Sequence, residues 1–398
     1  MMLIGEIKEY LTNRMIPFWV HMKDEEHGGF YGQMDGDLTL QKEADKGGIL
    51  NSRILWFFAN TYGELGDEHL LECATHAYRF LKEAFWDKEY GGVYWSVHYN
   101  GIQADTTKHT YCQAFAIYAL SSYYAVSKDE KALEMAEKLF DLIEDNCTDS
   151  YGYMEAFDRR FMPVDNEKLS ENGVMADKTM NTILHVFEAY TELYRVRKEE
   201  NKSIEFTNKV AHRLRFILNV IADRIYNPIL KRQEVFFDKK YRSILDLNSY
   251  GHDIEAAWLI DRGCEVLGER SYSQRMINIT TSLTEKIFET AFTGDSLYNE
   301  CCNGEIDKTR IWWVQAEAVI GFLNGYQKDK KEKKYYEAAT SIWNYIKKNF
   351  IDDRKGSEWF WSVDDQGISN KEKGIVNMWK CPYHNGRMCL EVMRRLKG

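Results

Sequence analysis

Proline is scarce in this chain, with only four among 398 residues. Because proline interrupts helices, its scarcity favours long helical segments. No apolar run approaches the roughly 20 residues that span a bilayer. The N-terminal segment MMLIGEIKEYLTNRMIPFW is amphipathic and lacks the basic start, apolar centre and small-residue cleavage site of a signal peptide. We therefore expect a helix-rich protein that does not enter a membrane.

Several site signatures are also missing. The eight cysteines show no CxxC and no paired zinc-ligand spacing, a pattern typical of reduced thiols in a cytoplasmic protein. The net charge is −10 and no run of Lys and Arg is long enough to follow a phosphate backbone, which excludes nucleic acid as a partner. The phosphate-binding loop, the dinucleotide glycine fingerprint and the serine nucleophile elbow are absent as well, so nucleotide binding and serine hydrolysis have no support.

Aromatic residues, by contrast, are abundant, at 14% of the chain with 11 Trp and 25 Tyr. Flat indole and phenol rings favour a site that stacks on the apolar faces of sugar rings, although a Trp-rich core would give the same composition. The 44% hydrophobic content is ample for a large core.

An aromatic segment flanked by glycine or acidic residues recurs at intervals of roughly 60 residues, with one longer interval in the middle. These segments begin at His27, Tyr90, Tyr151, Gln233, Ser296 and Ser357. Two stretches with helical periodicity lie between consecutive segments, as in HTYCQAFAIYALSSYYAVS followed by EKALEMAEKLFDLIEDN.

Six units of two helices, with no linker composition between them, predict one domain over residues 1–398. The predicted fold is all-α: an (α/α)6 barrel of six inner and six outer helices with short β-hairpin loops at one end. An open α-solenoid is the alternative, because periodicity alone does not show that the ends meet. In the barrel, the mouth of the ring with its aromatic loops would form the pocket.

Three histidines are candidates for chemistry. His252 precedes Glu255 by three residues, and His185 has the same HxxE spacing to Glu188, so each pair shares one helical face. Asn181 lies one turn before His185, and the third histidine, His384, follows a proline in WKCPYHNGRMC. Polar groups within apolar helices must find partners.

A lone buried histidine is more often structural, and three histidines could also bind zinc. The repeated histidine–glutamate spacing instead favours proton transfer, because imidazole titrates near neutral pH and a carboxylate tunes its basicity. Most of the other histidines, including His69, His76 and His212, are interpreted as surface groups.

The chain resembles the cellobiose 2-epimerases, which belong to the N-acylglucosamine 2-epimerase superfamily. The resemblance runs in order over nearly the whole chain and is carried by ADKGGILNSRILWFFA, KHTYCQAFAIYALSSYY, ADKTMNTILHVFEAYTELY, SYGHDIEAAWL, EIDKTRIWWVQAEAV and WKCPYHNGRMC. It implies an (α/α)6 barrel, in agreement with the repeat. It also implies interconversion of glucose and mannose at the reducing end of a β-1,4-linked disaccharide or oligosaccharide. No cofactor or metal is implied, and the protein is expected to be a monomer.

The same resemblance implies roles for the catalytic residues. His252 and His384 would be the acid/base pair on opposite faces of C2, and Glu255 would orient and tune His252. His185 would assist binding and ring opening, with Asn181 beside it.

The substrate-binding residues follow from the same segments. Arg53 and Tyr111 would contact the oxygens on C1 and C2; without the resemblance, a surface ion pair and a core tyrosine would be equally good interpretations. Trp313 and Trp379 would stack on sugar rings, and whether Trp312 or Trp313 faces the pocket is left open.

Four other functions compete with 2-epimerisation of cellobiose. An aldose–ketose isomerase would return the proton to C1 instead of C2, and an N-acylglucosamine 2-epimerase would use the same scaffold on another sugar. A glycoside hydrolase would need two carboxylates flanking the scissile bond, for which the sequence gives a weak case. A sugar-binding solenoid without activity is the fourth.

Overall fold

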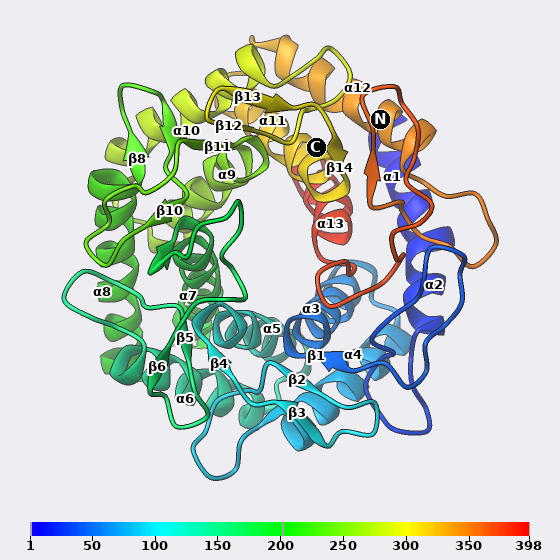
Figure 1. Cartoon of the computed structure of the whole chain (residues 1–398), viewed down its shortest axis with the longest axis vertical. Helices are drawn as coiled ribbons and strands as arrows, with labels where there is room; N and C mark the ends of the chain where they lie inside the picture. Colours follow the sequence, from blue (N-terminus) through cyan, green and yellow to red (C-terminus); the bar gives the residue numbers. More distant parts are fainter. Residues whose placement is uncertain (1, 201–202, 398) are drawn as a thin grey trace.

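The computed structural model describes residues 2–200 and 203–397, whose helices form two concentric rings (Figure 1). The inner ring consists of α3 (Gly48–Leu65), α5 (Thr110–Ser127), α7 (Met180–Glu200), α9 (Tyr250–Leu267), α11 (Trp312–Lys328) and α13 (His384–Leu396). The outer ring consists of α1 (Met2–Tyr10) with α2 (Ile16–His21), α4 (Glu68–Phe80), α6 (Glu130–Asn146), α8 (Ile204–Val220), α10 (Arg270–Thr290) and α12 (Lys333–Asn349). Short π-helical turns join α1 to α2 and extend α4 and α8, at Leu11–Met15, Leu81–Phe85 and Ile221–Ile225.

The inner ring is closed. Each inner helix packs against the next one along the chain, and α13 packs against α3. The prediction of an all-α fold is confirmed, and the alternative of an open solenoid is wrong because the two ends of the repeat meet. Within the described ranges, no helix combines the length and the apolar character needed to cross a bilayer.

Composition separates the two rings. The inner helix α5 is buried on nearly all sides, and its sequence contains no charged residue. The outer helix α6 alternates buried residues such as Leu139 with an acidic and basic outer face, as expected for an amphipathic surface helix. Asp129 caps α6 by accepting a hydrogen bond from the amide of Lys131.

Glycines allow the inner helices to approach one another closely. A methyl group on Gly321 would lie 2.4 Å from Ile254 of α9, and one on Gly386 would lie 2.6 Å from the Phe57 ring of α3. These distances are shorter than any normal carbon contact, so the seams α9–α11 and α13–α3 require residues without a side chain.

Short strands precede the inner helices, at the end of the ring where those helices begin. They are β1 (Lys46–Gly47), β4 (Lys108–His109), β7 (Lys178–Thr179), β11 (Leu247–Ser249) and β14 (Arg310–Ile311). Their antiparallel partners come from the next connection along the chain: β2 (Ser96–Val97), β5 (Ala156–Phe157), β10 (Phe236–Phe237), β12 (Glu300–Cys302) and β15 (Ser362–Val363).

Three of these pairs gain a third strand, from β3 (Gln103–Asp105), β6 (Pro163–Val164) and β13 (Glu305–Asp307), and β8 (Tyr226–Asn227) pairs with β9 (Arg232–Gln233). A bridge between Met34 and Val376 joins the first connection to the last. The connections thus form a continuous collar around the N-terminal ends of the inner helices.

Candidate active site

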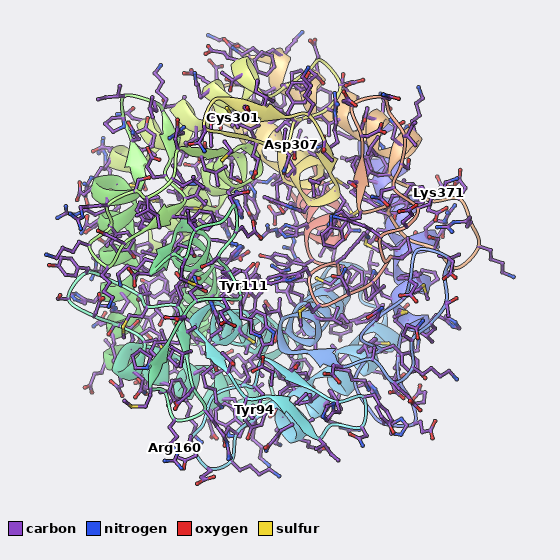
Figure 2. All side chains as sticks on the ribbon, viewed as in Figure 1. Tyr94, Tyr111, Arg160, Cys301, Asp307 and Lys371 are labelled. Atoms are coloured by element: carbon purple, nitrogen blue, oxygen red, sulfur yellow. The ribbon has the colours of Figure 1, made fainter. Side chains whose placement is uncertain are left out.

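A cavity of about 350 Å³ opens inside the collar, at the N-terminal ends of the inner helices. Tyr111, labelled in Figure 2, lies beside the central opening. The structure brings all nine residues predicted from the sequence to this one cavity. They are Arg53, Tyr111, Asn181, His185, His252, Glu255, Trp313, Trp379 and His384. Every inner helix contributes a side chain from its first turns, or its first residue in the case of α13.

His252 is held by a hydroxyl group. Its Nδ1 lies 2.7 Å from Oγ of Ser249, the residue just before α9, and its ring packs against Trp313 with centroids 4.7 Å apart. Burial, together with the charge of His185, lowers the pKa of His252 to about 3. The imidazole is therefore neutral at pH 7.

The prediction that Glu255 orients His252 is wrong. Oε1 of Glu255 accepts a hydrogen bond from Arg387 and lies 3.9 Å from Nδ1 of His384. The guanidinium group on α13 draws the carboxylate toward the ring axis, while the imidazole of His252 turns to Ser249. Burial and the charge of Glu317 raise the pKa of Glu255 to about 7. Within the described residues, Oε2 of Glu255 has no hydrogen-bond partner.

His185 pairs with the glutamate that its spacing predicts. Its Nδ1 lies 2.8 Å from Oε2 of Glu188, so the carboxylate accepts the Nδ1 proton and fixes the orientation of the imidazole. Burial alone would raise the pKa of Glu188, but Arg387 and His185 outweigh it and lower this pKa to about 2. Glu188 is therefore an anion at neutral pH.

His384 pairs with a glutamate that the sequence analysis missed. Its Nδ1 lies 2.7 Å from Oε1 of Glu317, whose Oε2 accepts from Nε1 of Trp258 at 2.9 Å. Burial, followed by the charge of Arg387, lowers the pKa of His384 well below its usual value. An acidic residue inside the apolar helix sequence WWVQAEAVIGF was the available signal.

Arg53 and Tyr111 form a donor pair at the bottom of the cavity. One Arg53 NH2 group donates to the Tyr111 hydroxyl at 2.8 Å, and the guanidinium lies 4.1 Å from the ring centre of Phe115. Arg53 is buried, which excludes the interpretation as a surface ion pair. Burial raises the pKa of Tyr111 well above its usual value, so the phenol keeps its proton.

Trp313 contacts both imidazoles of the predicted acid/base pair. Its ring centre is 4.7 Å from His252 and 5.4 Å from His384. Trp312 also borders the cavity, but it is almost fully buried and meets His384 edge-on. The partly exposed Trp313 thus presents the larger free surface, and Trp379 packs near Tyr111 at 6.1 Å on another wall.

The mouth of the cavity carries acidic residues that the sequence analysis did not single out. Glu171 lies in the connection before β7, and Glu300 begins β12; both line the cavity. Asn172 donates to Oε1 of Glu300 at 3.5 Å. Burial, then the charges of Glu171 and Asp307, raise the pKa of Glu300. The β12–β13 hairpin, marked in Figure 2 by Cys301 and Asp307, lies beside the central opening.

Two other histidines depart from the surface interpretation. His69 and His212 are exposed as predicted, but His76 is half-buried and its Nε2 lies 2.8 Å from the carbonyl oxygen of Gly29. His109 is fully buried at the start of α5. Both side chains are covered by residues of the connections: His76, within α4, contacts Gly29, and Nε2 of His109 lies 3.0 Å from Oδ1 of Asn166.

A three-histidine zinc site does not form among the described residues. The group with metal-ligand spacing in that part of the chain is Glu255, Glu317 and His384, whose ligand atoms lie within 4.8 Å of one another. The Arg387 guanidinium donates to both carboxylates of this group, so a cation supplied by the chain already lies there.

Proteins similar to this chain are known in both sequence and structure. The model of the family N-acylglucosamine 2-epimerase (GlcNAc 2-epimerase) matches residues 28–384. The chain is 51% identical over 394 residues to the cellobiose 2-epimerase of Ruminococcus albus, covering 99% of both chains. It is 50% identical, with a TM-score of 0.96 and full coverage of both chains, to the crystal structure of a sugar epimerase from a ruminal bacterium. The cellobiose 2-epimerase structure from Bacillus thermoamylovorans B4167 is 43% identical with a TM-score of 0.93, covering 99% of this chain and 100% of that one.

Proposed function

The chain belongs to the N-acylglucosamine 2-epimerase family, and on that premise we propose that it is a carbohydrate 2-epimerase whose substrate is cellobiose. It is an isomerase that inverts C2 of the reducing-end glucose to give mannose, and it accepts similar β-1,4-linked disaccharides. The observation that carries this proposal is the pair of neutral imidazoles, His252 and His384, which line one sugar-sized cavity and both contact the Trp313 indole.

The scaffold of this activity is the closed ring as a whole. The alternation of inner and outer helices supports its assignment as an (α/α)6 barrel, and the closure of α13 on α3 supports a single catalytic domain over residues 1–398. We further propose that the enzyme works as a monomer in the cytoplasm, as the reduced thiols and the family resemblance suggest.

Proton transfer at C2 is the chemical problem that the site must solve. The C2 hydrogen of a closed sugar ring is barely acidic, but ring opening creates an aldehyde beside it. One imidazole then removes the proton to give a cis-enediolate, and rotation about C2–C3 presents the other face. The second imidazole takes up a proton from solvent water and delivers it to C2, while the first releases its proton to solvent. A positioned acid or base is worth about 10²–10⁴ in rate.

The negative oxygens of the enediolate need fixed donors. Arg53 and the Tyr111 hydroxyl lie together at the bottom of the cavity, and their hydrogen bond of 2.8 Å keeps them in place. The inner helices also begin at this end of the ring, so the positive ends of their dipoles face the reacting atoms. Preorganised donors of this kind are often the largest single contribution to catalysis.

The remaining residues bind and orient the sugar. His185, held by Glu188, would assist ring opening, and Oδ1 of Asn181, which has no partner among the described residues, is free to accept from a hydroxyl. Trp313 and Trp379 offer flat faces to the two sugar rings. The proposed reaction requires no cofactor or metal, because the imidazoles transfer the proton and arginine stabilises the negative charge of the enediolate.

The experiment is incubation with cellobiose in D2O, followed by NMR of the products. Glucosyl-mannose with deuterium at C2 is the expected product. A keto sugar would indicate aldose–ketose isomerisation, free glucose would indicate hydrolysis, and unchanged cellobiose would leave only binding. His252→Ala and His384→Ala should each lose about 10²-fold or more of the rate, whereas His212→Ala, on the exposed face of α8, should not. A His252→Ala enzyme with normal turnover would overturn the assignment.

A further inference from the structure

Arg387 is almost completely buried and lies on α13, three residues after His384 of the cavity. From α13, its guanidinium reaches three glutamates on three other inner helices. It donates to Glu188 of α7 at 2.5 Å, to Glu255 of α9 and to Glu317 of α11 at 2.6 Å. One side chain therefore ties four inner helices together at the floor of the site.

Two of these glutamates hold imidazoles of the proposed active site. Glu188 accepts from Arg387 with Oε1 and from His185 with Oε2 at 2.8 Å. Glu317 accepts from both Arg387 and His384 with the same oxygen, Oε1. Each imidazole thus donates its Nδ1 proton to a carboxylate that is itself fixed by the same guanidinium.

The three carboxylates around Arg387 need a positive charge close to them. Three buried carboxylates close together repel one another, and burial raises the pKa values of Glu255 and Glu317. A carboxyl that took up a proton would no longer be a simple acceptor for an imidazole Nδ1–H, so the tautomer would be lost. Arg387 opposes this repulsion for all three carboxylates at once.

Other polar groups surround the three carboxylates but do not supply the positive charge that Arg387 provides. Tyr383 donates to Oε2 of Glu188 at 2.5 Å and accepts from Arg387, and the Arg53 guanidinium lies 4.5 Å from the Tyr383 ring. The phenol of Tyr118 lies near the charge of Glu188. None of these groups places a second cation on the carboxylates.

We propose that Arg387 is a positioning residue for epimerisation: it keeps Glu188 and Glu317 ionised and in place, and through them presents both His185 and His384 with a bare Nε2 toward the sugar. This inference rests on the proposed function. Arg387 itself lines a second cavity of about 740 Å³ at the opposite end of the ring and not the catalytic one, so its effect on the sugar is indirect.

The test compares Arg387→Lys, which keeps the charge but loses the forked donor, with Arg387→Met, which loses both. Arg394→Lys is the matched control, because Arg394 lies two turns further along α13 and is partly exposed. For each folded variant, kcat, KM and the pH profile of kcat with cellobiose are measured, with circular dichroism to establish the folded fraction.

We expect Arg387→Lys to lose about 100-fold in kcat with KM within about threefold, and Arg394→Lys to behave as the parent. The acid limb of the kcat profile should move to higher pH, because one shorter ammonium group cannot hold all three carboxylates and those without a donor take up protons more readily. If kcat fell only in proportion to the folded fraction and the acid limb stayed at the same pH, Arg387 would have a structural role alone. If Arg387→Met does not fold, the pH profile of kcat for Arg387→Lys distinguishes the positioning role from a structural one.

A second readout does not depend on the substrate. The ¹⁵N chemical shifts of labelled histidine should report the Nδ1–H tautomer for His185 and His384 in the parent and a mixture in Arg387→Lys. Unchanged shifts would overturn the positioning role. An enzyme that fails to epimerise cellobiose, yet shows this tautomer change, would contradict the proposed function alone.

Discussion

The three imidazoles of the cavity differ in what holds them. His185 and His384 donate to carboxylates, whereas His252 faces the hydroxyl of Ser249. A carboxylate fixes one tautomer and raises basicity, but a hydroxyl can either donate or accept. His252 can therefore exchange its proton between its two nitrogens more easily than the other two, which suits a group that acts as a base in one direction and an acid in the other.

Replacement of Ser249 by alanine tests this contact. Without the hydroxyl the His252 ring loses its hydrogen-bond partner at 2.7 Å, and we expect kcat for cellobiose to fall about tenfold with little change in KM, because ring orientation matters most in the transition state. Steady-state kinetics in both directions gives the measurement. Ser243→Ala, in the exposed turn before the same helix, is the control; equal kinetics in the two variants would contradict the role of Ser249.

Sequence spacing predicted some contacts at this scale and failed for others. The HxxE pattern is correct for His185 and Glu188, yet the same pattern fails for His252 and Glu255. Arg387, which comes from α13, donates to both glutamates, but only Glu188 also accepts from its histidine, because the imidazole of His252 lies against Ser249 instead. A local pattern has no information on such a partner, and for the same reason Glu317 and Arg387 were not singled out.

Among the elements, the start of α5 is controlled by one buried histidine. Nδ1 of His109 accepts from the amide of Tyr111 at 3.3 Å, so its Nε2 carries the proton and donates to Oδ1 of Asn166 at 3.0 Å. Asn166 in turn donates to the carbonyl of Ala176, across the connection that bears Glu171. His109 therefore fixes both the helix that carries Tyr111 and the loop at the cavity mouth.

Protonation of His109 should destabilise the fold. Burial lowers its pKa to about 4 in the folded chain, against about 6.5 in the unfolded chain. Between these values the unfolded chain binds a proton that the folded chain does not, so stability is lost as the pH falls. His109→Asn keeps a side chain that can cap a helix, but it has no imidazole to protonate. It should therefore not lose stability in this way as the pH falls.

The measurement is urea unfolding at pH 7.5 and pH 5. From pH 7.5 to pH 5 the parent should lose about 2 kcal/mol more of its free energy of unfolding than His109→Asn does. The control is His212→Asn, at an exposed position of α8, which should follow the parent at both pH values. Parallel losses in the parent and His109→Asn would show that His109 does not titrate between the two states.

At the mouth, two connections should select the outer sugar by charge. Glu171 and Glu300 both line the cavity, and if the reducing end binds at the imidazoles, the second ring of the disaccharide would lie toward these two residues. Among the cavity-lining residues of the described chain, Arg53 is the only arginine or lysine, and it lies at the bottom. A negative outer sugar therefore meets like charges without a compensating cation.

We expect kcat/KM to be about tenfold lower for glucuronosyl-β-1,4-glucose than for cellobiose. The double variant Glu171→Gln and Glu300→Gln should reduce this difference to about threefold, because it removes both charges. Glu305→Gln, an exposed position in the same hairpin, is the control. If the double variant and Glu305→Gln gave the same ratio of the two substrates, the rim carboxylates would not select charge.

The order of the elements was predictable, but their pairing was not. The aromatic segments correctly indicated short strands between helices, since turn residues and β-formers leave a local signal. The sequence did not show that β11 pairs with β12, which begins 51 residues later at Glu300. The sequence also did not show that Glu300 lies at the mouth of the cavity. Its position depends on the closed collar of connections and not on any one segment.

For the molecule as a whole, closure of the ring depends on how closely its last inner helix meets its first. α13 carries both His384 and Arg387, and its Gly386 packs against the Phe57 ring of α3. The active site is therefore built across the seam where the chain closes on itself. A displacement at this seam should affect stability and catalysis together.

Gly386→Ala is the corresponding prediction. The added methyl would lie 2.6 Å from Phe57 Cδ2, so α13 must shift, which should cost about 1–3 kcal/mol of the free energy of unfolding. Because His384 moves with the helix, kcat should also fall by about tenfold or more. The matched control is Gly5→Ala on α1, where an added methyl meets nothing within 4 Å and should stabilise by up to about 1 kcal/mol. Urea unfolding and steady-state kinetics on both variants make the comparison; a Gly386→Ala enzyme as stable and active as its parent would mean that the seam tolerates a wider spacing than the structure indicates.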